Sequence, residues 1–201
     1  MHVSLHTARA AHPTPAVFLD RDGTINVEKN YLYRIEDWEW IPNADQAIRQ
    51  LNKAGFLVVV VSNQAGIARG LYTAEDVMAL HHHVSTDLHS AGGTIDAYYF
   101  CPHHPEHGEQ RCCECRKPKP EMLLAAAMAL NIDLKKSWMV GDKGIDLLAA
   151  KAAGTQGILV QTGHGATEQT KLLPGTIVAA DLPAAVSIIL QHQGANGGMT
   201  P

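Results

Sequence analysis

The stretch AVFLDRDGT (residues 16–24) sets the architecture of the chain, because a short apolar run passes directly into two acidic residues and a glycine. Residues 16–19 predict a buried strand, and Asp20 and Asp22 follow at its carboxyl end. Side chains at positions i and i+2 of an extended backbone point the same way, so the two carboxylates are expected to face one place. Gly23 then allows the chain to turn sharply.

Two other apolar runs end in the same manner. FLVVVV is followed by Ser62 and Asn63, and SWMV is followed by a glycine and then by Asp142 and Lys143. Besides residues 16–19, strands are expected at residues 56–61, 95–100, 137–140, 157–160 and 176–179. Helical patterns that alternate with these strands cover residues 44–51, 73–88, 120–130, 144–153 and 183–191.

The alternation of strands and helices predicts an α/β fold, a Rossmann-like, doubly wound and mostly parallel sheet with helices on both faces. Such folds bind ligands beyond the carboxyl ends of their strands. We therefore expect the polar residues at the three strand ends to converge on one crevice. The chain between Asn63 and Lys117 is too short for a large cap domain, so a capless domain is expected.

Length and composition limit the classes of function. With 201 residues, 46% apolar and 18% charged, the chain fits one soluble domain at residues 16–192, between flexible tails at residues 1–15 and 193–201. A net charge of −4 gives no electrostatic basis for binding nucleic acid or an anionic membrane. Neither a signal peptide nor a membrane span is visible, which predicts a cytoplasmic protein, expected to be a monomer.

The acidic residues at the strand ends suggest a metal site. Asp20, Asp22 and Asp142 offer carboxylate oxygens without sulfur or imidazole, a set that suits Mg²⁺. An isolated Asp-x-Asp pair can instead simply cap a turn. The functional interpretation is favoured here because three polar strand ends coincide at one predicted edge of the sheet.

Such a site can carry out phosphoryl transfer. Once Mg²⁺ and Lys117 screen the charge of a phosphoryl group, the carboxylate of Asp20 can attack phosphorus and form an aspartyl-phosphate. Asp22 can give a proton to the leaving oxygen and later take one from water. Ser62 and nearby backbone N–H groups can hold the non-bridging oxygens.

All four cysteines lie in CPHHPEHGEQRCCECRKPKP (residues 101–120). The set that suits a tetrahedral structural Zn²⁺ is Cys101, His103, Cys113 and Cys115. A reducing compartment favours this metal over disulfides. Cys112 is the expected odd thiol, and His104 or His107 could replace the imidazole ligand.

The zinc loop, at about residues 101–117, has no hydrophobic core of its own. A bound metal could supply the missing folding energy. The loop would then position the following basic pair at the crevice. Arg116 could bind a substrate anion through two hydrogen bonds, and Lys117 could place a point charge beside the phosphoryl group.

The four segments FLDRDGT, VVVSNQAG, RKPKP and MVGDKGID resemble, in order, the motifs of the haloacid-dehalogenase-like phosphohydrolases, over about residues 16–163. The resemblance implies that Asp20 is the nucleophile and Asp22 the general acid and base. It further implies that Ser62 binds the phosphoryl group, that Lys117 stabilises its charge and that Asp142 binds Mg²⁺. The backbone carbonyl of Asp22 is another implied ligand.

The zinc loop of this capless chain resembles that of the D-glycero-D-manno-heptose 1,7-bisphosphate 7-phosphatase family, which acts in the assembly of lipopolysaccharide core heptose. The resemblance implies a sugar bisphosphate as substrate. The implied substrate contacts are Glu28, Lys29, Asn30, Tyr31, Ser62, Asn63, Gln64, Ala65, Arg116, Lys117 and Lys143. Glu121 departs from the family pattern, where a glycine is expected after the proline.

Two alternatives stay open at this point. The histidinol-phosphate phosphatases carry the same kind of loop, although the segment GIARG with Arg69 leans toward the heptose enzymes. A non-catalytic phosphate- or zinc-binding module is the other alternative, and the full Asp20, Asp22, Lys117 and Asp142 set argues against it.

Two histidine features are expected to be structural. His81, His82 and His83 follow one another on a predicted helix and point about 100° apart, so they cannot form one metal face. One of them is expected at the edge of the core and two in solvent. His164, in TGHG, is expected to be a loop residue rather than a catalytic base.

Overall fold

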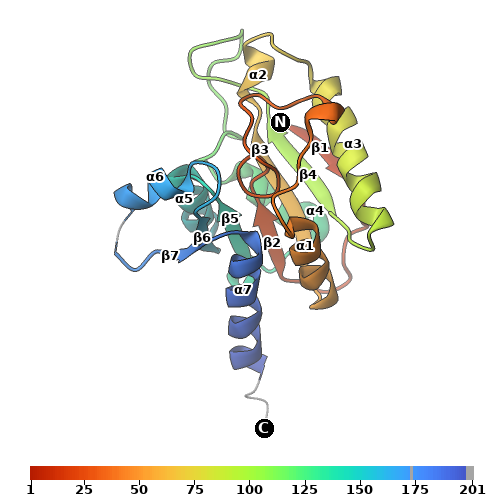
Figure 1. Ribbon diagram of the computed structural model, residues 1–201, viewed down its shortest axis with the longest axis vertical. Coiled ribbons are helices and arrows are strands. Elements are labelled where there is room, and N and C mark those ends of the chain that lie inside the picture. The colour runs from red at the N-terminus through yellow and green to blue at the C-terminus, as the bar shows by residue number, and fades with distance from the viewer. Residues whose placement is uncertain (173, 198–201) are drawn as a thin grey trace.

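The computed structural model describes residues 1–172 and 174–197 of the chain. Within these residues one seven-stranded sheet has the order β1-β4-β3-β2-β5-β6-β7, and every neighbouring pair is parallel except β1 and β4 (Figure 1). The strands are β1 (His2–Leu5), β2 (Ala16–Leu19), β3 (Leu57–Asn63), β4 (Ala97–Cys101), β5 (Trp138–Gly141), β6 (Gln156–Val160) and β7 (Ile177–Ala179).

Helices cover both faces of this sheet, which confirms the doubly wound α/β prediction. The α-helices are α1 (Ala44–Lys53), α2 (Ala65–Ala68), α3 (Ala74–Ser90), α4 (Glu121–Leu130), α5 (Gly144–Ala153), α6 (Gly165–Glu168) and α7 (Leu182–Gly197). Short 3-10 turns are η1 (Ile35–Asp37), η2 (Leu134–Lys136) and η3 (Gln169–Lys171). Among the residues described, none of these helices combines the length and hydropathy needed to cross a bilayer.

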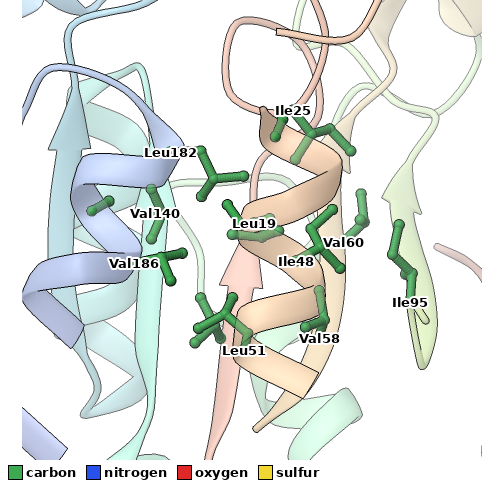
Figure 2. Close-up of a cluster of buried hydrophobic side chains, with 14 of the residues drawn as sticks. Leu19, Ile25, Ile48, Leu51, Val58, Val60, Ile95, Val140, Leu182 and Val186 are labelled. Atoms are coloured by element: carbon green, nitrogen blue, oxygen red, sulfur yellow. The ribbon is translucent and has the colours of Figure 1, made fainter. Parts of the chain in front are cut away.

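The alternating side chains of β2 build two separate cores. Val17 and Leu19 pack under α1, α3 and α7, whereas Phe18 packs on the other face against α4 and α5. Figure 2 shows the first core, in which Ile48 of α1 and Val186 of α7 come together over Leu19. Because β2 is covered on both faces, its carboxyl end delivers Asp20 from a fully buried strand.

The amino-terminal tail is a correction to the sequence analysis. Residues His2–Leu5 are not a flexible tail but form β1, which pairs antiparallel with β4. Their side chains alternate between half-buried and exposed, and the run is too short for that pattern to stand out in the sequence. The hydroxyl of Thr7 then donates a hydrogen bond of 2.6 Å to the carboxylate of Asp96, which fixes the chain beyond the strand.

The carboxyl-terminal end of the last helix also differs from the prediction. Helix α7 continues through residues 193–197, which were expected to be part of a flexible tail. Residues 198–201 lie outside the described residues. The polar composition of this segment suggested a tail, but the helix that packs on α1 simply extends past its last buried turn. The assignment of residues 16–192 to a single domain stays a prediction.

The three consecutive histidines point in different directions, as predicted, but one is buried in the core rather than at its edge. His81 is fully buried, His82 is exposed and His83 is half-buried. The His81 ring stacks on Tyr98 with centroids 4.3 Å apart. Neither of its ring nitrogens has a hydrogen-bond partner among the described residues. Burial and the nearby guanidinium of Arg21 lower the pKa of His81 well below its ordinary value.

This buried imidazole predicts a pH-dependent loss of stability. The unfolded chain takes up a proton on His81 near pH 6.5, but the folded chain does so only at lower pH. Below about pH 6.5 the unfolded state therefore binds more protons, and the free energy of unfolding falls by up to ~1.4 kcal/mol per pH unit. His81→Phe should remove this contribution, as measured by urea unfolding between pH 5 and 8.

The matched control is His82→Phe, at the next and exposed position of α3, which should keep the wild-type pH dependence. If His81→Phe and His82→Phe lose stability in parallel as the pH falls, His81 is not the responsible group.

Candidate active site

The three polar strand ends meet in one pocket of about 260 Å³ at the carboxyl edge of the sheet, as the sequence predicted. Its lining residues come from the carboxyl end of β3 and from the segments that follow β2, β3, β4, β5 and β6, including the first residues of α2 and α5. They are Asp20, Asp22, Glu28, Asn30, Tyr31, Ser62, Asn63, Gln64, Ala65, Tyr72, Arg116, Lys117, Lys143, Ile145 and His164.

The ammonium group of Lys117 lies between two carboxylates at the floor of this pocket. Its Nζ is 2.9 Å from Asp20 Oδ1 and 2.7 Å from Asp146 Oδ1, and it donates to the carbonyl of Val61 at 2.7 Å. Burial opposes the charge on this lysine, but the two carboxylates outweigh burial and raise its pKa above the ordinary value. Lys117 therefore carries a fixed positive charge beside Asp20.

A reciprocal pair of hydrogen bonds holds the backbone of Lys117 on the end of β3. The Asn63 amide donates to the Lys117 carbonyl at 3.0 Å, and the Lys117 N–H donates to the Asn63 side-chain oxygen at 3.1 Å. The peptide bond between Lys117 and Pro118 is cis. These bonds place a residue from the zinc loop beside a strand more than fifty positions earlier.

Asp146 is a site residue that the sequence analysis missed. It is fully buried in the first turn of α5, and its Oδ2 accepts a hydrogen bond of 3.0 Å from the backbone N–H of Lys143. Burial raises its pKa to about 6, although Lys117 opposes the shift. Its distance of four positions from Asp142, one helical turn, was the available signal. A side chain at Gly141 would collide with its carboxyl group, so only glycine fits there.

Asp142 completes a cluster of three acidic side chains. Asp20, Asp142 and Asp146 each offer a carboxylate oxygen within 4.8 Å of the others. Asp142 Oδ2 accepts from the backbone N–H of His164 at 2.8 Å, whereas its buried Oδ1 has no hydrogen-bond donor within the described chain. Burial, with the neighbouring Asp20 charge, raises the pKa of Asp142 to about 7. A hard divalent cation such as Mg²⁺ fits this donor set, since it satisfies that oxygen and relieves the repulsion.

The side chain of Asp22 lies outside this cluster, although it lines the same pocket as Asp20. Its oxygens accept from Arg21, from Asn26 at 3.1 Å and from Gln64 at 3.3 Å. Strand β2 ends at Leu19, so the extended-chain rule no longer holds at Asp22. The carboxyl group still lines the pocket. Binding of a metal by its backbone carbonyl stays a prediction.

Arg21 is the second residue that the sequence analysis missed. Its guanidinium is fully buried, pairs with Asp22 at 2.9 Å and donates to the carbonyl of Leu32 at 2.7 Å. An arginine between two aspartates carries no sequence signal for burial, because the side chain reaches its partners only in the folded structure. It fixes the orientation of the Asp22 carboxyl group.

Ser62 is held by a short relay of polar side chains. Its hydroxyl oxygen accepts from Gln64 Nε2 at 2.7 Å, and the Tyr72 hydroxyl donates to Gln64 Oε1 at 2.7 Å. A side chain at Gly66 would overlap the Tyr72 ring, so the tight turn of α2 is required for this packing. The relay orients the Ser62 hydroxyl at the pocket wall.

All but one of the expected substrate contacts line the pocket. Lys29 is the exception, because its ammonium group binds the carbonyl of Asp37 at 2.9 Å and the carboxylate of Glu39 at 2.9 Å. Its neighbours Asn30 and Tyr31 both adopt the left-handed backbone region, with φ of 53° and 61°. This local twist presents residues 30 and 31 to the pocket while Lys29 points to the surface.

Among the lining residues, the carboxylate of Glu28 contacts the side chains of both Lys143 and His164. Its Oε2 lies 3.4 Å from Lys143 Nζ and 3.5 Å from His164 Nε2. His164 belongs to the loop after β6, as predicted, but its half-exposed ring also lines the pocket. The wall therefore offers both donors and acceptors to a polar ligand.

The four predicted zinc ligands gather at the end of β4. Cys101 Sγ lies 3.6 Å from Cys113 Sγ and 3.7 Å from His103 Nδ1, which in turn is 3.6 Å from Cys115 Sγ. Ligand atoms around a tetrahedral zinc lie about 3.5–3.8 Å apart, given bonds of about 2.0–2.3 Å. A disulfide needs sulfurs at about 2.05 Å. The donor set therefore fits zinc, and the exposed Cys112 lies outside it.

This cluster connects directly to the pocket. The Arg116 guanidinium donates to the carbonyl of His103 at 3.0 Å, and the backbone N–H of Gln64 donates to the carbonyl of Cys101 at 2.8 Å. Cys115 immediately precedes Arg116 and Lys117. Three residues that line the pocket, Gln64, Arg116 and Lys117, are thus connected to the thiol cluster by a hydrogen bond or by the adjacent chain.

The buried pair of Asp146 and Lys117 generates a prediction. Asp146→Asn leaves the ammonium with one carboxylate fewer in a water-free environment, so the free energy of unfolding should fall by about 3–5 kcal/mol. Asp45→Asn, at the more exposed pair with Arg49 in α1, should cost less than about 1 kcal/mol. Equal losses in the two variants, measured by urea unfolding, would contradict a structural role for the buried pair.

Comparisons with known proteins agree with this architecture. The profile of the HAD-hydrolase-like family matches residues 114–185. The chain is 44% identical over 179 residues, 86% of its length, to D-glycero-beta-D-manno-heptose-1,7-bisphosphate 7-phosphatase of Yersinia pestis, of which 95% is covered. It is 45% identical over 195 residues to D-glycero-D-manno-heptose-1,7-bisphosphate 7-phosphatase of Thermosynechococcus vestitus, covering 90% of this chain and 97% of that protein.

A solved structure is similar over the same span. The D,D-heptose 1,7-bisphosphate phosphatase of B. bronchiseptica, complexed with magnesium and phosphate, superimposes with a TM-score of 0.80 at 37% identity. The match covers 89% of this chain and 99% of that one. Relatives this similar, matched over nearly their whole length, show that the chain is a phosphatase and belongs to the heptose-1,7-bisphosphate 7-phosphatase family of HAD-like hydrolases.

Proposed function

We propose that this phosphatase removes the 7-phosphate of D-glycero-D-manno-heptose 1,7-bisphosphate through an aspartyl-phosphate on Asp20, in the synthesis of lipopolysaccharide core heptose. The observation that carries the proposal is the Asp20 carboxylate at the pocket floor, 2.9 Å from Lys117 and beside Asp142 and Asp146. The names of relatives at 42–45% identity support the substrate. A cytoplasmic location and a monomeric state belong to the same proposal.

Asp20 acts as the nucleophile. One of its oxygens is held by Lys117 and by the backbone N–H of Arg21 at 2.8 Å, so the other oxygen is left to face the substrate phosphorus. The new bond joins that oxygen to phosphorus while the bond from phosphorus to the C7 oxygen breaks. Lys117 offsets the negative charge that accumulates on the phosphoryl oxygens, and the Ser62 hydroxyl holds one of them.

Asp22 acts first as the general acid and then as the general base. Its carboxyl group gives a proton to the leaving C7 oxygen, and afterwards takes one from the water that attacks the aspartyl-phosphate. That second attack releases inorganic phosphate and restores the Asp20 carboxylate. Arg21, Asn26 and Gln64 keep the Asp22 carboxyl group at the pocket lining during both steps.

Asp20 and Asp142, with the Asp22 carbonyl, would hold magnesium, and Asp146 lies next to them. Magnesium supplies charge screening that lets an anionic carboxylate approach an anionic phosphoryl group. The proposal is supported by the relative that was crystallised with magnesium and phosphate and by Asp142 Oδ1, which is buried and accepts no hydrogen bond within the described chain.

Recognition of the sugar is assigned to the polar rim. Glu28, Asn30 and Tyr31 line one side of the pocket, and Arg116 and Lys143 provide positive charge for a second anionic group. Lys29 is not part of this rim, because its ammonium group is paired at the surface.

Substrate preference tests the proposed function. Steady-state kinetics should give a kcat/KM for the heptose 1,7-bisphosphate at least about a hundredfold above that for histidinol phosphate, because the second phosphate and the sugar hydroxyls find partners in the rim. Equal specificity constants, or the reverse order, would contradict the heptose assignment and favour a histidinol-phosphate phosphatase.

The role of Asp20 as the nucleophile can be tested separately from the choice of substrate. Asp20→Asn keeps the volume of the side chain but removes the nucleophilic charge, so phosphate release should fall at least about a thousandfold. Turnover above about a tenth of the wild-type rate would exclude Asp20 as the nucleophile, whatever the substrate preference.

Zinc is proposed as the structural ion of Cys101, His103, Cys113 and Cys115. Purified protein should contain one equivalent of zinc, and Cys115→Ala should lose it together with thermal stability, because the loop has little apolar packing of its own. Cys112→Ala, in the exposed thiol outside the cluster, should keep both zinc and stability. Full stability of metal-free protein would rule out a structural ion.

A further inference from the structure

A second group of metal-ligand side chains lies in the same loop, outside the thiol cluster. His104, Glu106 and His107 each offer one donor atom, and these atoms all lie within 4.8 Å of one another. The two imidazole rings are 4.7 Å apart between centroids. None of the three lines the catalytic pocket, and neither the phosphatase chemistry nor the thiol cluster uses them.

The backbone fixes this group from both sides. On one side the thiol cluster holds the preceding residue, His103. On the other side Gly108 packs closely on Ala68 of α2, where an added Cβ would lie 3.2 Å from the Ala68 side chain. Its φ of 75° turns the chain back toward α2, beside which the loop rises in Figure 1. In the metal-free form the backbone N–H of Glu106 donates to His104 Nδ1 at 3.0 Å. This bond is exchanged for the metal bond when His104 Nε2 binds an ion, because Nδ1 then carries the ring proton.

We propose that His104, Glu106 and His107 form a second, exposed site for a borderline divalent cation such as Zn²⁺ or Ni²⁺. Two imidazoles and one carboxylate are donors that these ions accept, whereas Mg²⁺ prefers oxygen ligands and retains its water. Three protein ligands leave positions open to solvent, so this site differs from the closed thiol cluster. The second site therefore binds its ion more weakly than the thiol cluster does and exchanges it with ions in solution.

The donor separations are compatible with an ion after small movements. Ligand nitrogens and oxygens about 2.1 Å from a tetrahedral ion are about 3.4 Å apart, so donor atoms that lie within 4.8 Å of one another must close in by at most about 1.4 Å. His104 and His107 are half-buried and Glu106 is exposed, and none of them is locked in a packed core. Rotation of the side chains suffices because the backbone turn already brings them together.

The guanidinium group of Arg69 competes with a metal ion for His104. It lies 3.3 Å from His104 Nε2 and also sits over the ring of Tyr31, 5.8 Å from the ring centroid. A cation bound to His104 Nε2 must displace this positive charge. Occupancy of the site therefore moves Arg69 away from the mouth of the pocket, where Tyr31 is a lining residue.

Metal titration of the intact protein tests the site. Protein is first analysed for its resident zinc and then titrated with Zn²⁺ by equilibrium dialysis and with Ni²⁺ by calorimetry. We expect one further equivalent of either ion. His107→Ala and Glu106→Gln should weaken that equivalent at least about tenfold without loss of the resident zinc. Arg69→Met should bind it more tightly, because the competing charge is gone.

The matched control is His89→Ala, which removes an exposed imidazole from α3. It should leave the second equivalent unchanged. The proposal is overturned if no further equivalent binds, if the equivalent persists in both loop variants, or if it disappears in His89→Ala. Because binding is counted directly, this result does not depend on the substrate or on turnover.

Discussion

The arrangement of the site depends on one buried ammonium group between two carboxylates. Lys117 reaches Asp20 and Asp146 at ion-pair distance, and all three side chains are buried, so solvent screens their charges only weakly. A buried pair of this kind is strongly destabilising when one partner is lost, so it constrains every element that supplies a partner. Those elements are the end of β2, the start of α5 and the loop that follows the thiol cluster.

Close backbone approaches support the same arrangement. Gly23 and Gly163 pass so near Asp142 that any side chain there would collide with its carboxyl group. Gly141 does the same for Asp146. Packed backbone therefore holds the carboxylates on several sides, so they cannot move apart in response to their mutual repulsion. Such preorganised charge is what a phosphoryl-transfer site requires.

Much of this was accessible from the sequence, and the failures have physical causes. The buried strands and their polar ends could be predicted because apolar runs of β-branched residues leave a strong signal, and the thiol set could be predicted from its spacing. Asp146 was missed because its ion-pair partner, Lys117, is distant in the chain. Arg21 was missed because the sequence carries no signal that its side chain is buried. Asp22 lines the expected pocket, but its carboxylate lies outside the acidic cluster because the extended strand ends at Leu19. The four-residue β1 was too short for its alternation to be distinguished from a tail.

Strand β1 also bears on how the first residues of the protein can be altered. It covers the outer edge of β4, the strand whose last residue is Cys101. Trimming the chain to Ala16 would expose the backbone N–H and carbonyl groups along that edge, and unpaired edges invite sheet-to-sheet association between molecules. The solubility of a shortened protein would thus be limited by the uncovered edge of β4, the strand that carries the first thiol.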